Sequence, residues 1–327
     1  MVVIETKEIT SIHVIGESKN RVLIVKVLNS SSPLVIKSEE TETAASGELV
    51  RRSNVGAMLE FHGTLFSKLR SLPFQTERLK LTEISALRAC NPNKVTGLKN
   101  NEAWPTLFDN EVAKQNGKIK AIVKISYVEQ LANLGGMTKD LQQISVIRTE
   151  LESGAAEFVV ELGQILAVDF FIGNHDRFSE SAKLTGPQNI FFSTKGGVIK
   201  ATGIDTYDLY GDWSDLNQTI EQIEAKSGNK WPGRMLAPGN VKLRDAICTS
   251  AIDEFLVWAY QGGGGFRAEG KPIADCNISQ SRKNALIKKL HKGVSEAKSI
   301  LRKKYQLGDN VAALQAGIRS RWNIIRG

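Results

Sequence analysis

The sequence predicts an α+β protein of two lobes, with a first lobe rich in strands and a second lobe that is mainly helical. Three observations lead to this prediction. The chain has 327 residues, which suits two modest domains, and 41% of them are hydrophobic, enough to bury a core. Runs of β-branched residues dominate the first part of the chain, whereas helical periodicity dominates the rest. We place the junction near 127–130, so that the first lobe comprises residues 1–127 and the second 128–327.

Short β-branched runs separated by polar turns predict the strands of the first lobe. After the third run the apolar residues change to a helical spacing, which predicts a helix over 48–72. The segment 91–118 is polar and is expected to be a loop. The expected strands are residues 11–16, 21–27, 33–37, 78–82 and 119–125.

A long apolar segment predicts the central helix of the second lobe at 155–171, and Gly173 shortly after it is a typical helix stop. A β-hairpin is expected to follow, with strands at 189–192 and 198–204 around a pair of glycines. The later part of the chain returns to a helical spacing. The further helices are expected near 216–227, 241–261 and 281–305.

The net charge of +8 is concentrated at the end of the chain. Twelve of the 43 Lys and Arg residues but only two of the 35 Asp and Glu residues lie within 282–326, so this segment carries +10 and the rest of the chain −2. Because the body of the protein is nearly neutral, the charge does not indicate a nucleic-acid-binding protein, and we expect no nucleic-acid partner. No apolar run approaches the ~20 residues of a membrane helix, and we expect no Sec signal at the N-terminus.

The polar residues that are best placed for chemistry follow the central helix. A turn at 196–197 pairs hairpin residues whose numbers sum to 393, and Asn189 and Asp205 sum to 394, so these two are expected to face each other within one residue. An amide oxygen and a carboxylate at one end of a hairpin are the hard oxygen ligands that Mg²⁺ prefers. Asp176, at the end of the central helix, is then free to orient a hydroxyl. This is the arrangement that phosphoryl transfer from ATP requires.

These residues belong to a motif in which an Asp, an Asn and an Asp-Arg pair are followed by an Asn and an Asp. It consists of Asp169, Asn174, Asp176, Arg177, Asn189 and Asp205. The motif resembles the catalytic core of the actin-fragmin kinase and phosphoinositide 3- and 4-kinase branch of the protein kinase-like fold. The resemblance spans about residues 11–210. It implies a two-lobed protein kinase-like fold, with a small β-rich N-lobe and a mainly helical C-lobe.

The resemblance also implies a role for the residues of the motif. Asp176 would be the catalytic residue that positions the acceptor hydroxyl and takes its proton. Arg177, assigned to the catalytic site, would support the catalytic loop together with Asp169. Asn189 and Asp205 would bind Mg²⁺ or Mn²⁺.

The same resemblance places the nucleotide contacts in the first lobe. Lys37 on the third strand would hold the α- and β-phosphates of ATP, and Glu60 in the helix that follows would pair with it, with Glu48 as a competing candidate. A lysine on a strand is otherwise often an exposed edge residue. The remaining contacts are Gly16 and Ser18 in the loop that covers the phosphates and Tyr127 and Glu129 in the hinge beside adenine.

The implied activity is that of an ATP-dependent phosphotransferase, in the first place a Ser/Thr protein kinase of the actin-fragmin kinase-like type, acting on a host cytoskeletal or signalling protein. Two alternatives stay open: a phosphoinositide (lipid) kinase, and a kinase-fold effector that transfers AMP or serves as a non-catalytic scaffold. A compact kinase without regulatory domains resembles bacterial effectors involved in virulence, which implies a cytoplasmic protein or one delivered into a host cell by a non-Sec route. Cys90, Cys248 and Cys276 are isolated and are expected to be free thiols in a reducing compartment.

The basic end of the chain has two open interpretations. Within 286–305 the apolar residues follow one helical stripe and most of the lysines and arginines occupy the other faces. The segment is either the solvated side of an ordinary helix or a docking surface for an acidic protein or an anionic membrane. The segment 318–322 could extend such a surface.

One competing enzyme class is excluded by its histidine requirement. The block 173–176, Gly-Asn-His-Asp, also matches calcineurin-like metallophosphoesterases. That class needs an upstream Asp-x-His and several histidines downstream. The four histidines of this chain lie at positions 13, 62, 175 and 291 and cannot build such a dinuclear site.

Overall fold

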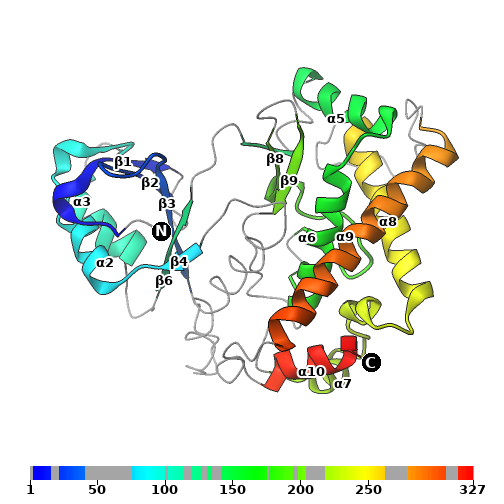
Figure 1. The fold of residues 1–327 in the computed structure, drawn as a ribbon. Coiled ribbons are helices and arrows are strands. Elements are labelled where there is room, and N and C mark those ends of the chain that lie inside the picture. Colours follow the sequence, from blue (N-terminus) through cyan, green and yellow to red (C-terminus); the bar gives the residue numbers. More distant parts are fainter. Residues whose placement is uncertain are drawn as a thin grey trace. The chain divides into compact units, whose positions relative to one another are not determined.

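In the computed structural model (Figure 1), the chain forms a mixed α+β fold, as the sequence predicts. Among the described residues, those up to Ser126 belong to one compact unit and those from Leu131 onwards to another. The boundary expected after residue 127 falls between them. The structure describes residues 3–15, 22–40, 76–99, 102–113, 120–126, 131–134, 141–174, 177–193, 198–203, 218–261, 278–306 and 316–326.

The first unit contains a six-stranded sheet with the strand order β4-β6-β3-β2-β1-β5. Neighbouring strands are antiparallel, except that β5 is parallel to β1. The expected strands near 11–16, 21–27, 33–37 and 119–125 are confirmed, whereas 78–82 is wrong beyond Arg78 because a helix begins at Leu81. The strands are β1 (Ile9–Ile15), β2 (Val22–Val27), β3 (Leu34–Glu40), β4 (Thr76–Arg78), β5 (Val95–Thr96) and β6 (Lys120–Ser126).

One face of this sheet packs against short helices. Alternate residues of the central strands, such as Leu23 and Ile36, are fully buried, and they share a core with Leu87 of α2. The indole Nε1 of Trp104, also in this core, donates to the carbonyl oxygen of Leu87 at 3.0 Å. The helical elements are η1 (Thr6–Glu8), α2 (Leu81–Arg88), η4 (Pro92–Lys94), α3 (Trp104–Leu107) and the π-helical η5 (Phe108–Ala113).

The expectation of a loop over 91–118 is therefore wrong in its described part, which contains η4, β5, α3 and η5. Trp104, Leu107, Phe108 and Val112 are buried there, so the segment supplies much of the core. Each of its elements is too short to show a period of its own in the sequence.

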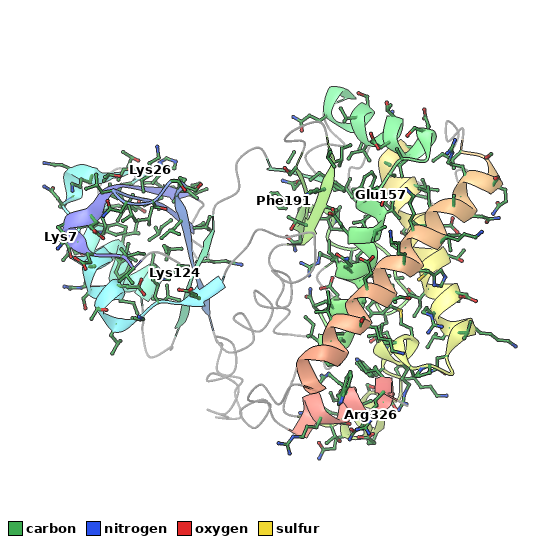
Figure 2. The ribbon with its side chains drawn as sticks, viewed as in Figure 1. Lys7, Lys26, Lys124, Glu157, Phe191 and Arg326 are labelled. Atoms are coloured by element: carbon green, nitrogen blue, oxygen red, sulfur yellow. The ribbon has the colours of Figure 1, made fainter. Side chains whose placement is uncertain are left out.

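A buried ion pair links the sheet to α2. Lys124 projects from β6 (Figure 2). It is 2% exposed, and its Nζ lies 2.7 Å from Oε1 of the fully buried Glu83 and 3.3 Å from Oε2 of Glu77. The Glu83 carboxylate also accepts from the backbone N–H of Ile4 at 3.1 Å and of Lys80 at 2.9 Å. Glu83 thus ties the N-terminal segment, the start of α2 and β6 together.

This ion pair predicts acid sensitivity of the first unit. Burial alone would raise the pKa of Glu83, but the hydrogen bonds from Lys124 and from the N–H groups of Lys80 and Ile4 hold it below its ordinary value of 4.5. A carboxyl whose pKa is lower in the folded state stabilises the fold above its unfolded pKa, and this stabilisation is lost as the pH falls through the folded pKa. We expect the free energy of unfolding of Glu83→Gln to be lower than that of wild type at pH 7. Below pH 4.5 it should change less with pH than that of wild type.

Urea unfolding followed by circular dichroism between pH 3 and pH 7 measures this effect. The matched control is Asp109→Asn, which removes a carboxylate from a more exposed pair with Arg88 in the same unit. If the free energies of unfolding of wild type and Glu83→Gln fall equally with pH below 4.5, the acid sensitivity does not arise from Glu83.

The second unit is built around α6 (Phe158–Ile172), every residue of which is buried. The helix α9 (Gln280–Gln306) runs along α6, and α8 (Val241–Gln261) packs on α9 (Figure 1). The expected helices at 155–171, 241–261 and 281–305 are confirmed, and 216–227 is helical from Ile220. The other elements are α5 (Leu141–Ser153), α7 (Ile220–Ser227), η6 (Pro187–Asn189), η9 (Pro232–Leu236), α10 (Ala316–Arg326) and the sheet β7 (Leu131–Asn133), β8 (Ile190–Ser193) and β9 (Lys200–Gly203).

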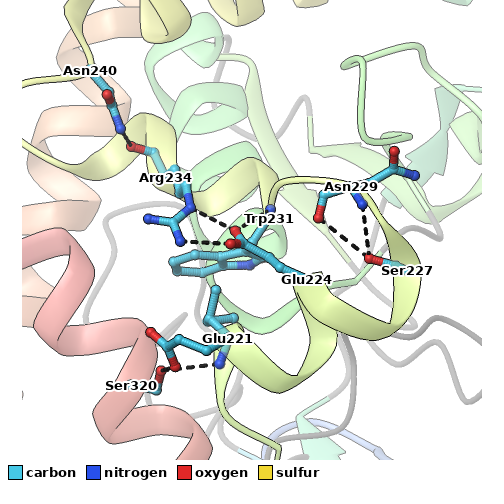
Figure 3. A network of polar contacts seen from close by, with 9 residues as sticks. Glu221, Glu224, Ser227, Asn229, Trp231, Arg234, Asn240 and Ser320 are labelled. Atoms are coloured by element: carbon cyan, nitrogen blue, oxygen red, sulfur yellow. Dashed lines mark hydrogen bonds and ion pairs between the residues drawn. The ribbon is translucent and has the colours of Figure 1, made fainter.

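Polar contacts fasten α7 and α10 to the rest of this unit (Figure 3). The Glu224 carboxylate of α7 accepts from Nε and Nη2 of Arg234 at 2.6 and 2.7 Å and from the backbone N–H of Trp231 at 2.8 Å. The Ser320 hydroxyl of α10 donates to Glu221 at 2.8 Å. No helix in the described part of the chain is long and apolar enough to cross a membrane.

Candidate functional site

The end of α6 places the first residues of the motif. The helix stops at Gly173, whose φ of +80° is the left-handed conformation that glycine adopts without strain. The backbone N–H groups of Gly173 and Asn174 both donate to the carbonyl oxygen of Asp169, each at 2.8 Å. The helix stop that the sequence predicts is confirmed, and the chain turns back towards the helix there.

The side chain of Asp169 is the centre of a buried polar cluster. It is fully buried, as is Arg177, whose Nε donates to Oδ2 of Asp169 at 2.8 Å while its Nη2 donates to Oδ1. Asn174, 1% exposed, donates from Nδ2 to the same Oδ1 at 2.9 Å. A bidentate, charge-assisted pair of this kind fixes geometry as well as contributing energy. It holds both ends of the segment from Asn174 to Arg177, which contains Asp176.

Backbone hydrogen bonds join this segment to the start of the hairpin. The carbonyl oxygen of Arg177 accepts from the N–H groups of Thr185 at 2.9 Å and Gly186 at 3.3 Å. Gly186 in turn accepts from the N–H of Asn189 at 3.0 Å, in the turn η6 that leads into β8. Asn189 is half-buried and directly precedes the first strand of the hairpin.

The second strand of the hairpin passes over the guanidinium of Arg177. A Cβ atom on Gly203 would lie 2.9 Å from Cζ and 3.0 Å from Nε of Arg177, so a larger residue there would press on the guanidinium that Asp169 holds. In the hairpin, Ile190 pairs with Gly203, and the paired numbers sum to 393 as predicted. Asn189 therefore precedes one member of this pair, and Asp205 follows the other two residues later in the sequence.

Three of the predicted site residues lie within the described part of the chain: Lys37, Arg177 and Asn189. The structure brings Arg177 and the start of the hairpin together, whereas Lys37 belongs to the other unit. The predicted site residues outside the described residues are Gly16, Ser18, Glu60, Tyr127, Glu129, Asp176 and Asp205, and Glu48 and His175 also lie there.

Lys37 occupies an interior strand of the first sheet. On β3 it pairs with Val22 of β2 and Val123 of β6, so the alternative of an edge lysine is wrong. Its neighbour Ile36 points into the core, so the half-buried Lys37 side chain lies on the opposite sheet face.

Arg177 was assigned to the catalytic residues of the motif. Because its side chain is fully buried and engaged by Asp169, it does not face solvent or a substrate in the described structure. Its contacts are those of a positioning residue that holds the neighbouring backbone.

Sequence reasoning missed Glu161 of α6, a second acidic group in contact with the hairpin. It is 9% exposed and its Oε2 accepts from the backbone N–H of Ala201 on β9. Burial raises the pKa of Glu161 to about 7, against the opposing effects of the Ala201 N–H and of Lys200. An acidic residue within an otherwise apolar helical run was the signal that could have identified it.

The structure also shows how the described part of the basic segment packs. Its apolar stripe is buried against the rest of the unit, as Leu286, Leu290 and Leu301 show. Several of its cations have intramolecular partners: Lys283 pairs with Asp253, Lys289 with Glu157, and Arg282 donates to the carbonyl oxygen of Ser153 at 2.7 Å. The remaining exposed lysines of the described part of α9 are Lys288 and Lys292. These three cations therefore take part in contacts within the unit, and both interpretations of the basic segment stay open.

Comparisons with known proteins add no family assignment. No protein-family model matches this chain, and no curated protein matches it. The contacts of α6, Arg177 and the β8–β9 hairpin are therefore the basis for a functional conclusion.

Proposed function

We propose that this protein transfers the γ-phosphoryl group of ATP to a hydroxyl group, with a Ser or Thr of a protein as the preferred acceptor. One observation carries the proposal. The buried Arg177 side chain bonds to Asp169 at the end of α6 and lies against Gly203 at the end of β9. Arg177 thereby links the end of α6 to the end of β9, and Asp176 and Asp205 follow these two ends in the sequence.

The proposed roles follow from chemistry and position. Asp176, which directly precedes Arg177 in the sequence, would orient the acceptor hydroxyl and take its proton. Asn189 and Asp205 offer an amide oxygen and a carboxylate, which fit the preference of Mg²⁺ or Mn²⁺ for hard oxygen ligands. When bound, the cation neutralises charge on the phosphates of ATP.

In the first unit, Lys37 would hold the α- and β-phosphates of ATP. Its place on an interior strand supports this role, because a strand with neighbours on both sides holds its side chains more firmly than an edge does. The half-buried side chain lies on the sheet face that α2 does not cover. Glu60 would pair with it.

Asp176→Asn and Asp205→Asn are expected to lower phosphate transfer by at least about a thousandfold, because one removes the base and the other a metal ligand. The measurement is transfer of label from [γ-³²P]ATP with Mg²⁺ or Mn²⁺ to proteins of a cell lysate. The matched control Asp245→Asn removes an exposed carboxylate of α8 in the same unit and is expected to leave transfer unchanged.

Parallel reactions separate the alternatives. Label that enters phosphoinositide vesicles instead of protein indicates a lipid kinase, and label from [α-³²P]ATP in protein indicates transfer of AMP. If no label that depends on Asp176 appears in protein, in lipid or in the chain itself, the proposed phosphate transfer is wrong. The remaining alternative is then a non-catalytic scaffold.

A further inference from the structure

The helix α6 holds β9 at a second point, away from Arg177. In the three-stranded sheet the order is β7-β8-β9, so β9 is an outer strand. Such a strand exposes backbone groups that no neighbouring strand satisfies. The Glu161 carboxylate supplies that partner to the N–H of Ala201.

Two acidic residues of one helix therefore fix one short strand. Glu161 binds the backbone of Ala201, and Asp169 acts through Arg177, which lies against Gly203. Beyond Gly203 the chain continues to Asp205, for which we proposed a role as metal ligand.

We propose that Glu161 is a positioning residue of the phosphotransfer site, which fixes β9 and thereby the metal ligand Asp205. This inference rests on the proposed function. It assigns Glu161 no contact with ATP, metal or acceptor. Its effect passes through the backbone of β9, so its loss should weaken metal binding rather than the chemistry at saturating metal.

The charges around Glu161 make its contribution depend on pH. Lys200 of β9 favours its ionised form, while burial and Glu157 of the same helix oppose it. From α9, Lys289 pairs with Glu157, and Lys292 lies close enough to lower the pKa of Glu157. Because burial raises the pKa of Glu161 to about 7, its charge changes near neutral pH.

The ionisation of Glu161 makes the stability of the fold depend on pH. The folded pKa of Glu161 lies above its ordinary value of 4.5, so the folded protein binds the proton more tightly than the unfolded chain. Stability due to this group is therefore complete below pH 4.5 and declines until the pH has passed about 7. Above that pH, the ionised carboxylate binds the Ala201 N–H more strongly, which tightens the link to β9 at a cost in global stability.

The test compares Glu161→Leu, which removes the acceptor, with Glu161→Gln, which keeps an acceptor oxygen but cannot ionise. Glu157→Gln is the matched control, an exposed carboxyl on the turn that begins the same helix. We expect Glu161→Leu to speed hydrogen exchange of the Ala201 amide by at least about tenfold and to raise the Mg²⁺ concentration for half-maximal phosphate transfer about 10–100-fold. The rate at saturating Mg²⁺ should stay close to that of wild type.

If wild type transfers phosphate and folded Glu161→Leu needs the same Mg²⁺ concentration, the role of Glu161 is wrong while the proposed function stands. Absence of transfer in wild type would overturn the proposed function and this inference with it. If Glu161→Leu does not fold, the pH dependence of the Mg²⁺ requirement in Glu161→Gln tests the proposal instead. The ratio of the Mg²⁺ requirement of wild type to that of Glu161→Gln should change near pH 7, since the ionisation of ATP is common to both proteins and cancels in this ratio. Identical profiles would refute the proposal.

Discussion

Arg177→Met is expected to lower the free energy of unfolding of the second unit by about 3–5 kcal/mol. The substitution keeps most of the side-chain volume but removes the guanidinium, leaving the fully buried carboxylate of Asp169 without its charge partner. Asn174 still donates to it, but the Asn174 amide carries no charge. An uncompensated buried charge is among the most destabilising outcomes of a single substitution.

The measurement is chemical denaturation followed by circular dichroism, together with phosphate transfer at a temperature where the variant is still folded. Lys283→Met is the matched control, because it breaks the partly exposed pair with Asp253 in the same unit and should cost at most about 1 kcal/mol. Combining Arg177→Met with Asp169→Asn should recover part of the loss, since no buried charge then remains. Equal losses in Arg177→Met and Lys283→Met would contradict the role of the buried pair.

Arg177→Lys separates charge from geometry. Lysine retains the positive charge but cannot bind Asp169 with two parallel hydrogen bonds or lie flat beneath Gly203. We expect intermediate stability and strongly reduced phosphate transfer, because the backbone next to Asp176 depends on that geometry. Transfer equal to that of wild type would show that charge alone suffices.

Several elements of the fold could be predicted because their signal is local. The apolar run at 155–171 predicts a buried helix, and Gly173 marks its end through its own backbone preference. The hairpin register followed from the position of its turn alone, and the observed pairing of Ile190 with Gly203 agrees. Local turn chemistry and periodicity are sufficient for such features.

Other features depend on tertiary partners and could not be read from the sequence. The one-turn α3 is too short to show a period, and its place in the core depends on Trp104 packing beneath Leu87. The helix α5 was missed although Ile144, Ile147 and Leu151 have a helical spacing and are all buried. Val146, an exposed apolar residue between Ile144 and Ile147, blurs that signal.

The candidate site shows the same division. Asp169 and Arg177 were identified from the resemblance of their motif to a kinase family, yet only the structure shows that both are fully buried. Glu161 contacts the backbone of Ala201, and Gly203 lies against the guanidinium of Arg177. Neither contact has a local sequence pattern. Supporting contacts of this kind arise from segments that are distant in the chain.

The crossing of α6 and α9 gives the second large effect. Two glycines, Gly163 of α6 and Gly293 of α9, allow the helix backbones to approach each other directly. A Cβ atom on Gly293 would lie far inside van der Waals contact with the carbonyl oxygen of Val160, and one on Gly163 would clash in the same way with that of Leu290. Both obstacles are backbone atoms in the buried contact between the two helices, and they cannot rotate away as a side chain can.

Gly293→Ala is therefore expected to destabilise the second unit by about 3 kcal/mol or more, and Gly163→Ala by a similar amount. The direction is informative because alanine is the better helix former by about 1 kcal/mol, so helix propensity alone predicts stabilisation. Denaturant midpoints of the single variants measure the effect. Gly239→Ala is the matched control, since a Cβ atom there meets nothing within 4 Å, and it should be neutral or slightly stabilising.

The double variant tests whether the two glycines form one contact. Once a Cβ atom at position 293 has forced the helices apart, a second one at 163 meets less resistance, so the combined loss should be smaller than the sum of the single losses. Additive losses would indicate two independent clashes. Because α6 also carries Glu161 and Asp169, forced separation of the helices should weaken phosphate transfer even where the variants remain folded. The basic helix α9 would then affect phosphate transfer by positioning α6, whether or not its exposed lysines bind a partner.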